Sequence, residues 1–189
     1  TVYTEGITSI TAEDIRYATA MNKSIKLLGN SWRVDGKIYA MVCPMLLDNA
    51  HPLSGVNDVF NAIFVRGNMV DETMFYGKGA GKLPTASAVV ADVVDCVKHK
   101  GRNVMTLWSY EKLELGSAME VERTFFVRIK DRAALEKAKE AFHAVQTVTV
   151  DGLDDEFGLV TANMTEQAFA QAAAQFDVAG RIRFDKTTI

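Results

Sequence analysis

The sequence predicts an α/β (α+β) protein in which a mixed or antiparallel sheet covered by helices is followed by a ferredoxin-like βαββαβ domain. Three observations predict this class. A glycine-rich turn joins an apolar run to a helical pattern at residues 76–92. Asp35-Gly36 separates two strand-like runs and is a strong hairpin signal. Residues 122–184 show the order strand, helix, strand, strand, helix, strand, which is the split βαβ pattern.

The composition is that of an ordinary folded protein. Of 189 residues, 48% are hydrophobic and 24% are charged, so the chain is not of the disordered class. A net charge of −3 gives no electrostatic reason to bind nucleic acid or an anionic membrane, and the apolar runs are too short to span a bilayer. Cys43 and Cys96 suggest no disulfide framework, which favours a reducing, cytoplasmic environment. With His51, His99 and His143 they lack metal-ligand spacing, so no metal site is expected.

The first part of the chain is expected to form a helix and a β-hairpin. Thr11 is a candidate N-cap for a helix over 11–22, with acidic residues in its first turn and a short apolar stripe. Residues 24–34 and 37–43 are predicted strands around the Asp-Gly turn. Both faces of the second strand are apolar, so both should be buried. A helix layer can cover one face, and a second subunit is a hypothesis for the other.

A second hairpin is expected after a connection at residues 44–50. His51 stands beside a proline and is more often a hydrogen-bonded loop residue than a catalyst. Strands are predicted at 61–66 and 69–76, with Gly67-Asn68 as their turn. The second of these strands is followed directly by the glycine-rich turn.

The glycine-rich turn is the main candidate ligand site in the sequence. Gly77, Gly79 and Gly81 precede Pro84, a residue preorganised for the first turn of a helix. A helix that starts there offers free N–H groups and a positive dipole end to a phosphate or a carboxamide. Neither the phosphate loop nor the dinucleotide fingerprint is matched. From these residues alone, a packing role for the turn is equally well supported.

The helix that follows, over residues 86–98, carries a valine stripe wide enough for burial against a sheet. Residues 103–121 are expected to form a linker, in which Trp108 and Tyr110 suggest packing on another part of the protein. A domain boundary is expected near residue 121.

Residues 76–92, Tyr-Gly-Lys-Gly-Ala-Gly-Lys-Leu-Pro-Thr-Ala-Ser-Ala-Val-Val-Ala-Asp, resemble the signature near the end of the catalytic region of the homoserine dehydrogenase family. Further blocks agree in order: Glu5-Gly6-Ile7, Thr11-Ala12-Glu13-Asp14-Ile15, Ile25-Lys26-Leu27-Leu28-Gly29, His51-Pro52-Leu53 and Asn61-Ala62-Ile63-Phe64-Val65. The resemblance covers roughly residues 2–97. It implies an NAD(P)-dependent interconversion of L-aspartate 4-semialdehyde and L-homoserine in threonine and methionine biosynthesis.

The same resemblance implies a site and a partner. Gly79, Ala80 and Gly81 would lie against the NADP or NAD cofactor. Family members pair through the first sheet, so a homo-oligomer, and most simply a homodimer, is implied. The family also begins with a Rossmann domain, and its catalytic lysine and acidic substrate-binding residues come just before the Glu-Gly-Ile block. The chain resembles the C-terminal portion of such an enzyme, so we expect no catalytic residue in it and no turnover of homoserine by it alone.

The last part of the chain resembles an ACT domain, the regulatory module that follows the catalytic region in many family members. The expected division is therefore a catalytic and dimerisation part at 1–102, a linker at 103–121 and an ACT-like domain at 122–189. ACT domains that bind an amino acid usually have glycine after the first strand, whereas this chain has Ala133 and Ala134 there. Weak or absent threonine binding is expected. The alternative function is a non-enzymatic ACT-type module for amino-acid sensing or oligomerisation.

Overall fold

A computed structural model describes residues 2–102 and 107–185, which form two compact units. Unit 1 joins Thr1–Ser54 to Leu113–Ile189, and unit 2 is Gly55–Lys112. The units therefore follow a different division from the domain boundaries expected near residues 102 and 121, because the chain after the linker folds together with the first segment. The division of the sequence into domains at residues 102 and 121 therefore stays a prediction.

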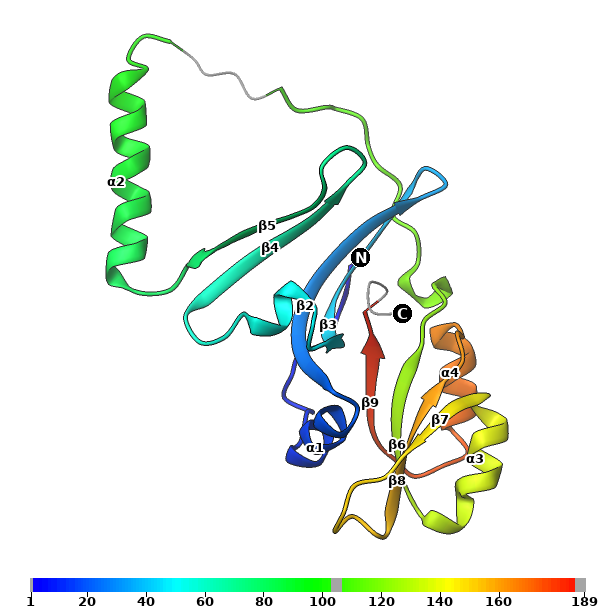
Figure 1. Cartoon of the computed structure of the whole chain (residues 1–189). Helices are drawn as coiled ribbons and strands as arrows, with labels where there is room; N and C mark the ends of the chain where they lie inside the picture. The colour runs from blue at the N-terminus through cyan, green and yellow to red at the C-terminus, as the bar shows by residue number, and fades with distance from the viewer. Residues whose placement is uncertain (1, 103–106, 186–189) are drawn as a thin grey trace. The chain divides into compact units, whose positions relative to one another are not determined.

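Unit 1 is built on a mixed seven-stranded sheet in the order β1-β3-β9-β6-β8-β7, with β2 paired to β3 (Figure 1). Its strands are β1 Tyr3–Thr4, β2 Lys23–Val34, β3 Lys37–Asp48, β6 Phe125–Lys130, β7 Ala144–Val148, β8 Glu156–Thr161 and β9 Val178–Phe184. Strand β3 is parallel to β1 and β9, whereas the other pairs are antiparallel. The predicted α/β class with a mixed sheet is confirmed.

Local signals place the first elements where the sequence predicts them. Helix α1 (Ala12–Ala20) is capped by Thr11, whose Oγ1 accepts from the Asp14 N–H at 3.4 Å. The Asp14 carboxylate in turn accepts from the Thr11 N–H at 2.9 Å, which completes a capping box. Asp35 and Gly36 join β2 to β3 with φ of 50° and 81°, the left-handed values that a two-residue hairpin turn requires.

Strand β3 is longer than predicted, and the expected connection at 44–50 is wrong for most of its length. The strand continues through Pro44 to Asp48, and Pro44 pairs with Leu27 of β2. On its other edge β3 pairs with β1 at residues 41 and 42 and with β9 at 45 and 46. Pro44 lies between the residues that pair with β1 and those that pair with β9. Its missing N–H therefore removes no hydrogen bond from the sheet.

The two faces of the unit 1 sheet carry different cores. On one face Phe125, Val127 and Ile129 of β6 pack with α3 (Leu135–Ala141) and α4 (Glu166–Ala173). On the opposite face Phe126 packs with Tyr17 of α1, their ring centroids 5.3 Å apart. The predicted order strand, helix, strand, strand, helix, strand is confirmed as β6-α3-β7-β8-α4-β9.

The face of β3 that carries Tyr39, Met41 and Cys43 is partly covered by the chain itself. Met41, Cys43 and Met45 are buried with Ala118, which lies in the short 3-10 helix η2 (Ala118–Glu120). Tyr39 is only partly buried and stacks on Trp32 at 5.7 Å between ring centroids. Burial of these residues therefore does not require another subunit. Two further 3-10 helices are η1 (Pro52–Gly55) and η3 (Arg132–Ala134).

Unit 2 contains a two-stranded hairpin of β4 (Phe60–Gly67) and β5 (Asp71–Lys78), followed by helix α2 (Lys82–Lys98). The valines of the predicted stripe are 44–69% exposed, and no described residue of α2 is buried. The expectation that this stripe lies against a sheet is therefore wrong for the described chain. Trp108 and Tyr110 are likewise exposed rather than packed, and residues 103–106 of the expected linker lie outside the described residues.

Among the described residues, no helix has both the length and the apolar character needed to cross a membrane.

Candidate functional site

The predicted site residues Gly79, Ala80 and Gly81 form the whole connection between β5 and α2. The Gly79 N–H donates to the Val59 carbonyl at 3.3 Å, which holds the connection against the start of the hairpin. Gly81 is the N-cap of α2, and its carbonyl accepts from the Thr85 N–H at 3.1 Å. The helix thus begins four residues before the predicted start, since Pro84 is tolerated in its first turn.

The local backbone requires glycine at position 81, whereas the contact that restricts Gly79 is with the movable end of a side chain. Gly81 has φ of 116°, a conformation that residues with a side chain rarely adopt. A Cβ on Gly79 would overlap the side-chain amide of Asn61 on β4. A Cβ on Gly77 would meet open space, so nothing around that position requires glycine. The packing role and the binding role of the glycines are therefore compatible, and an experiment must separate them.

The start of α2 is suited to an anion or to a hydrogen-bond acceptor. No side chain caps it, and its first turn contains no acidic residue. The N–H groups and the dipole of a 17-residue helix are therefore available at that end. Lys78 lies beside the connection with its Nζ 5.6 Å from the centroid of the Phe60 ring. A shallow hollow of about 310 Å³ borders Gly79 along the hairpin, next to Phe60 and Tyr76, which stack at 4.8 Å.

His51 has a structural contact that agrees with the expectation for a loop histidine. Its Nδ1 accepts from the Leu53 N–H at 3.1 Å, just before η1. Among the described residues, no group of three or more His, Cys, Asp or Glu side chains is placed to hold a metal ion.

Unit 1 holds a buried arginine cluster that sequence reasoning did not identify. Arg128 of β6 is 4% exposed, and three of its nitrogens have acceptors. Nε donates to Asp14 Oδ1 at 3.0 Å, Nη1 to Glu156 Oε2 at 2.8 Å and Nη2 to Thr11 Oγ1 at 3.1 Å. Burial lowers the pKa of Arg128, but the neighbouring carboxylates outweigh it and raise the pKa above its ordinary value. The cluster ties the first turn of α1 to β6 and β8.

A second cluster surrounds Arg183 of β9. Its guanidinium binds both carboxylate oxygens of Glu166, donates to Glu5 Oε2 at 2.8 Å and donates to the Tyr3 hydroxyl at 3.1 Å. Burial raises the pKa of Glu5, but the hydrogen bonds from Arg183 and Tyr3 and the charge of Arg181 bring it below its ordinary value. The available sequence signal was an arginine inside each apolar strand, which predicts a buried ion pair without naming the partner.

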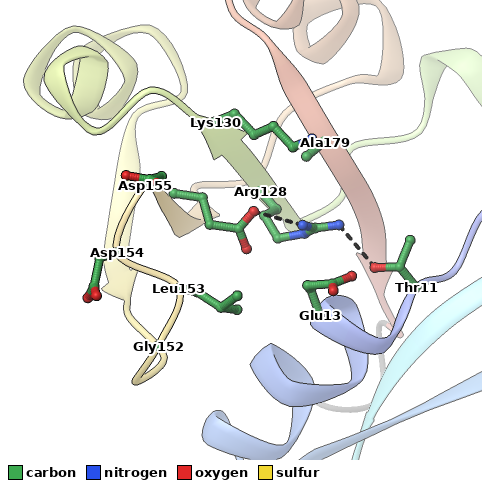
Figure 2. Close-up of a pocket in the computed structure, with 10 residues that line it drawn as sticks. Thr11, Glu13, Arg128, Lys130, Gly152, Leu153, Asp154, Asp155 and Ala179 are labelled. Carbon is green, nitrogen blue, oxygen red and sulfur yellow. Dashed lines mark hydrogen bonds and ion pairs between the residues drawn. The ribbon is translucent and has the colours of Figure 1, made fainter.

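Beside Arg128 lies a hollow of about 480 Å³ that also was not predicted (Figure 2). Thr11 and Glu13 line it from the start of α1, Gly152 to Asp155 from the connection between β7 and β8, and Glu156 from the start of β8. Figure 2 shows Thr11 bonded to Arg128, with Glu13 on the same side and Asp154 and Asp155 on the opposite side of the hollow.

Comparison with known proteins identifies relatives of this chain. A family model described as homoserine dehydrogenase matches residues 1–94. The homoserine dehydrogenase of Bacillus subtilis is 47% identical over 98 residues, which are 52% of this chain and 23% of that protein. That of Mycobacterium bovis is 31% identical over 198 residues, covering 93% of this chain and 45% of the relative.

Solved structures extend the similarity over nearly the whole chain. A homoserine dehydrogenase from Thiobacillus denitrificans superposes with a TM-score of 0.81 and 29% identity, covering 97% of this chain and 47% of that one. One from S. aureus superposes with a TM-score of 0.71 at the same identity and coverage. The chain spans less than half the length of each of these four proteins.

Proposed function

The chain belongs to the homoserine dehydrogenase family, and from this premise we propose that it forms part of an enzyme that interconverts L-aspartate 4-semialdehyde and L-homoserine with NADP or NAD. The similarity of residues 1–94 to the family and the superposition of 97% of the chain on a solved relative support the proposal. The setting would be threonine and methionine biosynthesis in the cytoplasm. The non-enzymatic sensing module considered from the sequence gains no support from these relatives.

We propose that Gly79, Ala80 and Gly81 contribute to the cofactor site. The observation that carries this is the start of α2, which no side chain caps. Two glycines lie in the connection before it, and its first turn has no acidic residue. These groups fit a phosphate or a carboxamide, because backbone N–H groups approach such a ligand closely where side chains are absent. The bound nicotinamide would supply or accept the hydride. This chain would orient it through backbone donors, and we assign the catalytic residues to other parts of the enzyme.

The experiment is a kinetic comparison of Gly81→Val with Ala91→Val in the complete enzyme. Ala91 lies within α2 and away from the connection, so introducing valine there serves as the control. A residue forced into the backbone conformation of Gly81 costs on the order of 1–3 kcal/mol. If that free energy is lost from cofactor binding, the affinity for the cofactor should fall roughly five- to hundredfold.

We expect Gly81→Val to raise the cofactor KM or to lower kcat/KM with little change in melting temperature. The proposal fails if both variants lose stability alike and the folded Gly81→Val enzyme keeps normal cofactor kinetics. Ala80→Val adds bulk to the same connection, and we expect it to weaken cofactor use in the same direction.

We further propose that residues 122–189 act as an ACT-like module whose turn after β6 gives weak or absent threonine binding. The turn after β6 is closed by its own contacts, because Asp131 has φ of 94° and its Oδ1 accepts from the Ala133 N–H at 3.0 Å. The methyl groups of Ala133 and Ala134 leave less room for an effector than glycine would. A tight, saturable calorimetric response to threonine that maps to residues 131–134 would contradict this.

We propose a homo-oligomer, most simply a dimer. Support comes from the apolar side chains that the described chain leaves uncovered, such as Ile63 and Phe75 on the hairpin. Obligate interfaces bury large apolar areas of this kind. Sedimentation that gives a monomer at micromolar concentration would overturn the proposal.

A further inference from the structure

The hollow beside Arg128 has the size and position of a binding site. Its volume of about 480 Å³ lies within the range of small-ligand pockets, roughly 300–1,000 Å³. It lies wholly within unit 1, where the start of α1 forms one wall and the connection between β7 and β8 forms another. The two walls come from distant parts of the sequence, so a molecule bound between them would contact both.

The charge of the lining favours a cation. Four acidic residues line the hollow, namely Glu13, Asp154, Asp155 and Glu156, whereas the basic residues are Arg128 and Lys130. The Arg128 guanidinium already has partners, because its Nε, Nη1 and Nη2 donate to Asp14, Glu156 and Thr11. Lys130 alone does not balance the remaining acids.

A buried carboxylate oxygen supplies an independent observation. Glu156 is 7% exposed, and its Oε2 accepts from Arg128 Nη1 at 2.8 Å. Its other oxygen, Oε1, is buried and has no hydrogen-bond partner among the described residues. An unsatisfied buried polar group costs about 1–3 kcal/mol, and more when it is charged. Such an oxygen in the wall of a hollow indicates that a donor is missing there.

The Tyr17 hydroxyl is a second buried group that lacks a partner in the described chain. Burial and the charge of Glu156 raise its pKa to about 12, so it stays a neutral hydroxyl. A neutral phenol can both donate and accept, but Tyr17 is not among the residues that line the hollow.

We propose that this hollow binds a small primary ammonium ion, which donates to Glu156 Oε1 and to the acidic rim while its hydrocarbon part contacts Leu153 and Ala179. An –NH₃⁺ group has three donors, which suits one buried carboxylate and neighbouring acceptors. Because Oε1 has no exposed surface, binding requires the Glu156 side chain to change rotamer. The ammonium can be that of an α-amino acid or of an aliphatic diamine. The proposal is independent of the dehydrogenase activity, since the site lies in unit 1 and is tested by binding.

The first test is a titration of the purified chain with ethylammonium chloride, followed by heteronuclear NMR of the backbone amides. Tetramethylammonium chloride, which has the charge but no N–H donor, and sodium chloride are the controls. We expect saturable shifts in α1 and in residues 152–156 with ethylammonium alone. Equal responses to the three salts, or no saturable response, would overturn the proposal and leave water as the donor to Oε1.

Variants then locate the bound ion. Glu156→Gln keeps the shape of the side chain but removes its charge, and we expect affinity to fall by about tenfold or more. Because this change also disturbs Arg128, Ala179→Leu is the second variant, which fills the hollow without altering any charge. Asp151→Asn removes a carboxylate from the same connection outside the lining and serves as the matched control. Wild-type binding by Ala179→Leu would refute the site even if Glu156→Gln fails to fold.

Two further ligands identify the source of the ammonium. Alanine should bind more tightly than ethylammonium if the site takes an α-amino acid, because its carboxylate can pair with Lys130. Diaminobutane should bind more tightly if the site takes a diamine, because its second ammonium can pair with Asp154 or Asp155. Tighter binding of either ligand supports the proposal, whereas failure of both to compete with ethylammonium contradicts it.

Discussion

Replacing Arg128 by methionine tests whether the buried cluster holds unit 1 together. The arginine is 4% exposed, and the two carboxylates it binds, Asp14 and Glu156, are 1% and 7% exposed. Methionine preserves much of the volume but leaves both carboxylates buried without their cation. Breaking a buried ion pair by removing one partner typically costs about 3–5 kcal/mol. A domain is stabilised by only about 5–15 kcal/mol, so the loss should be large.

The assay is urea unfolding of the chain, with Arg33→Met as the control. Arg33 is on β2 and exposed, so this variant makes the same chemical change without uncovering a buried acid. Surface changes of this kind usually alter the free energy of unfolding by about 0.5 kcal/mol or less. We expect Arg128→Met to exceed that several-fold.

A rescue experiment separates the charge from the packing. Adding Asp14→Asn and Glu156→Gln to Arg128→Met removes both uncompensated charges, so the triple variant should regain part of the lost stability. Equal losses for Arg128→Met and Arg33→Met, or a triple variant less stable than Arg128→Met, would refute the reasoning.

Three further outcomes follow from the same structure. A thiol reagent at neutral pH should modify Cys96 and spare Cys43 until the protein unfolds, because Cys43 is buried and burial raises its pKa. The folded pKa of Glu5 lies below its ordinary 4.5, so the stability it supplies is complete above that pH and is lost as pH falls through the folded value. Urea unfolding of Glu5→Gln should therefore depend less on pH below about 5 than the wild type does. Gly158→Ala should lower the unfolding free energy by about 1–3 kcal/mol, because its Cβ would lie 2.5 Å from Phe126 Cε2, and normal stability would contradict this.

The sequence predicted those features whose causes are local. The cap at Thr11 and the turn at Asp35-Gly36 each depend on a few adjacent residues, and both are present in the structure. The connection at 44–50 was predicted wrongly because Pro44 is acceptable only through the gap between β1 and β9. That gap depends on pairing with residues far along the chain, which no local pattern contains.

The sequence also indicated that some surfaces should be buried without indicating the partner. Periodicity places the valines of α2 on a broad stripe, but it cannot specify what covers them, and the described chain leaves them exposed. Arg128 is a similar case, because Asp14 is 114 residues away and Glu156 is 28 residues away in the sequence. The candidate cofactor site at Gly79 to Gly81 was named from the sequence and stays a prediction, whereas the arginine clusters and the hollow of unit 1 were found only in the structure.

The position of β9 has a consequence for how unit 1 folds. Among the described residues this strand follows all the others in the sequence, yet it lies inside the sheet between β3 and β6. A chain released during synthesis before β9 would have two open sheet edges, and such edges readily pair with other chains. The pairs between residues 45–46 and 183–184 must also close a very long loop, which slows folding. Productive folding of unit 1 is therefore expected only after β9 has been synthesised, and a chaperone that shields β3 and β6 until then would help most.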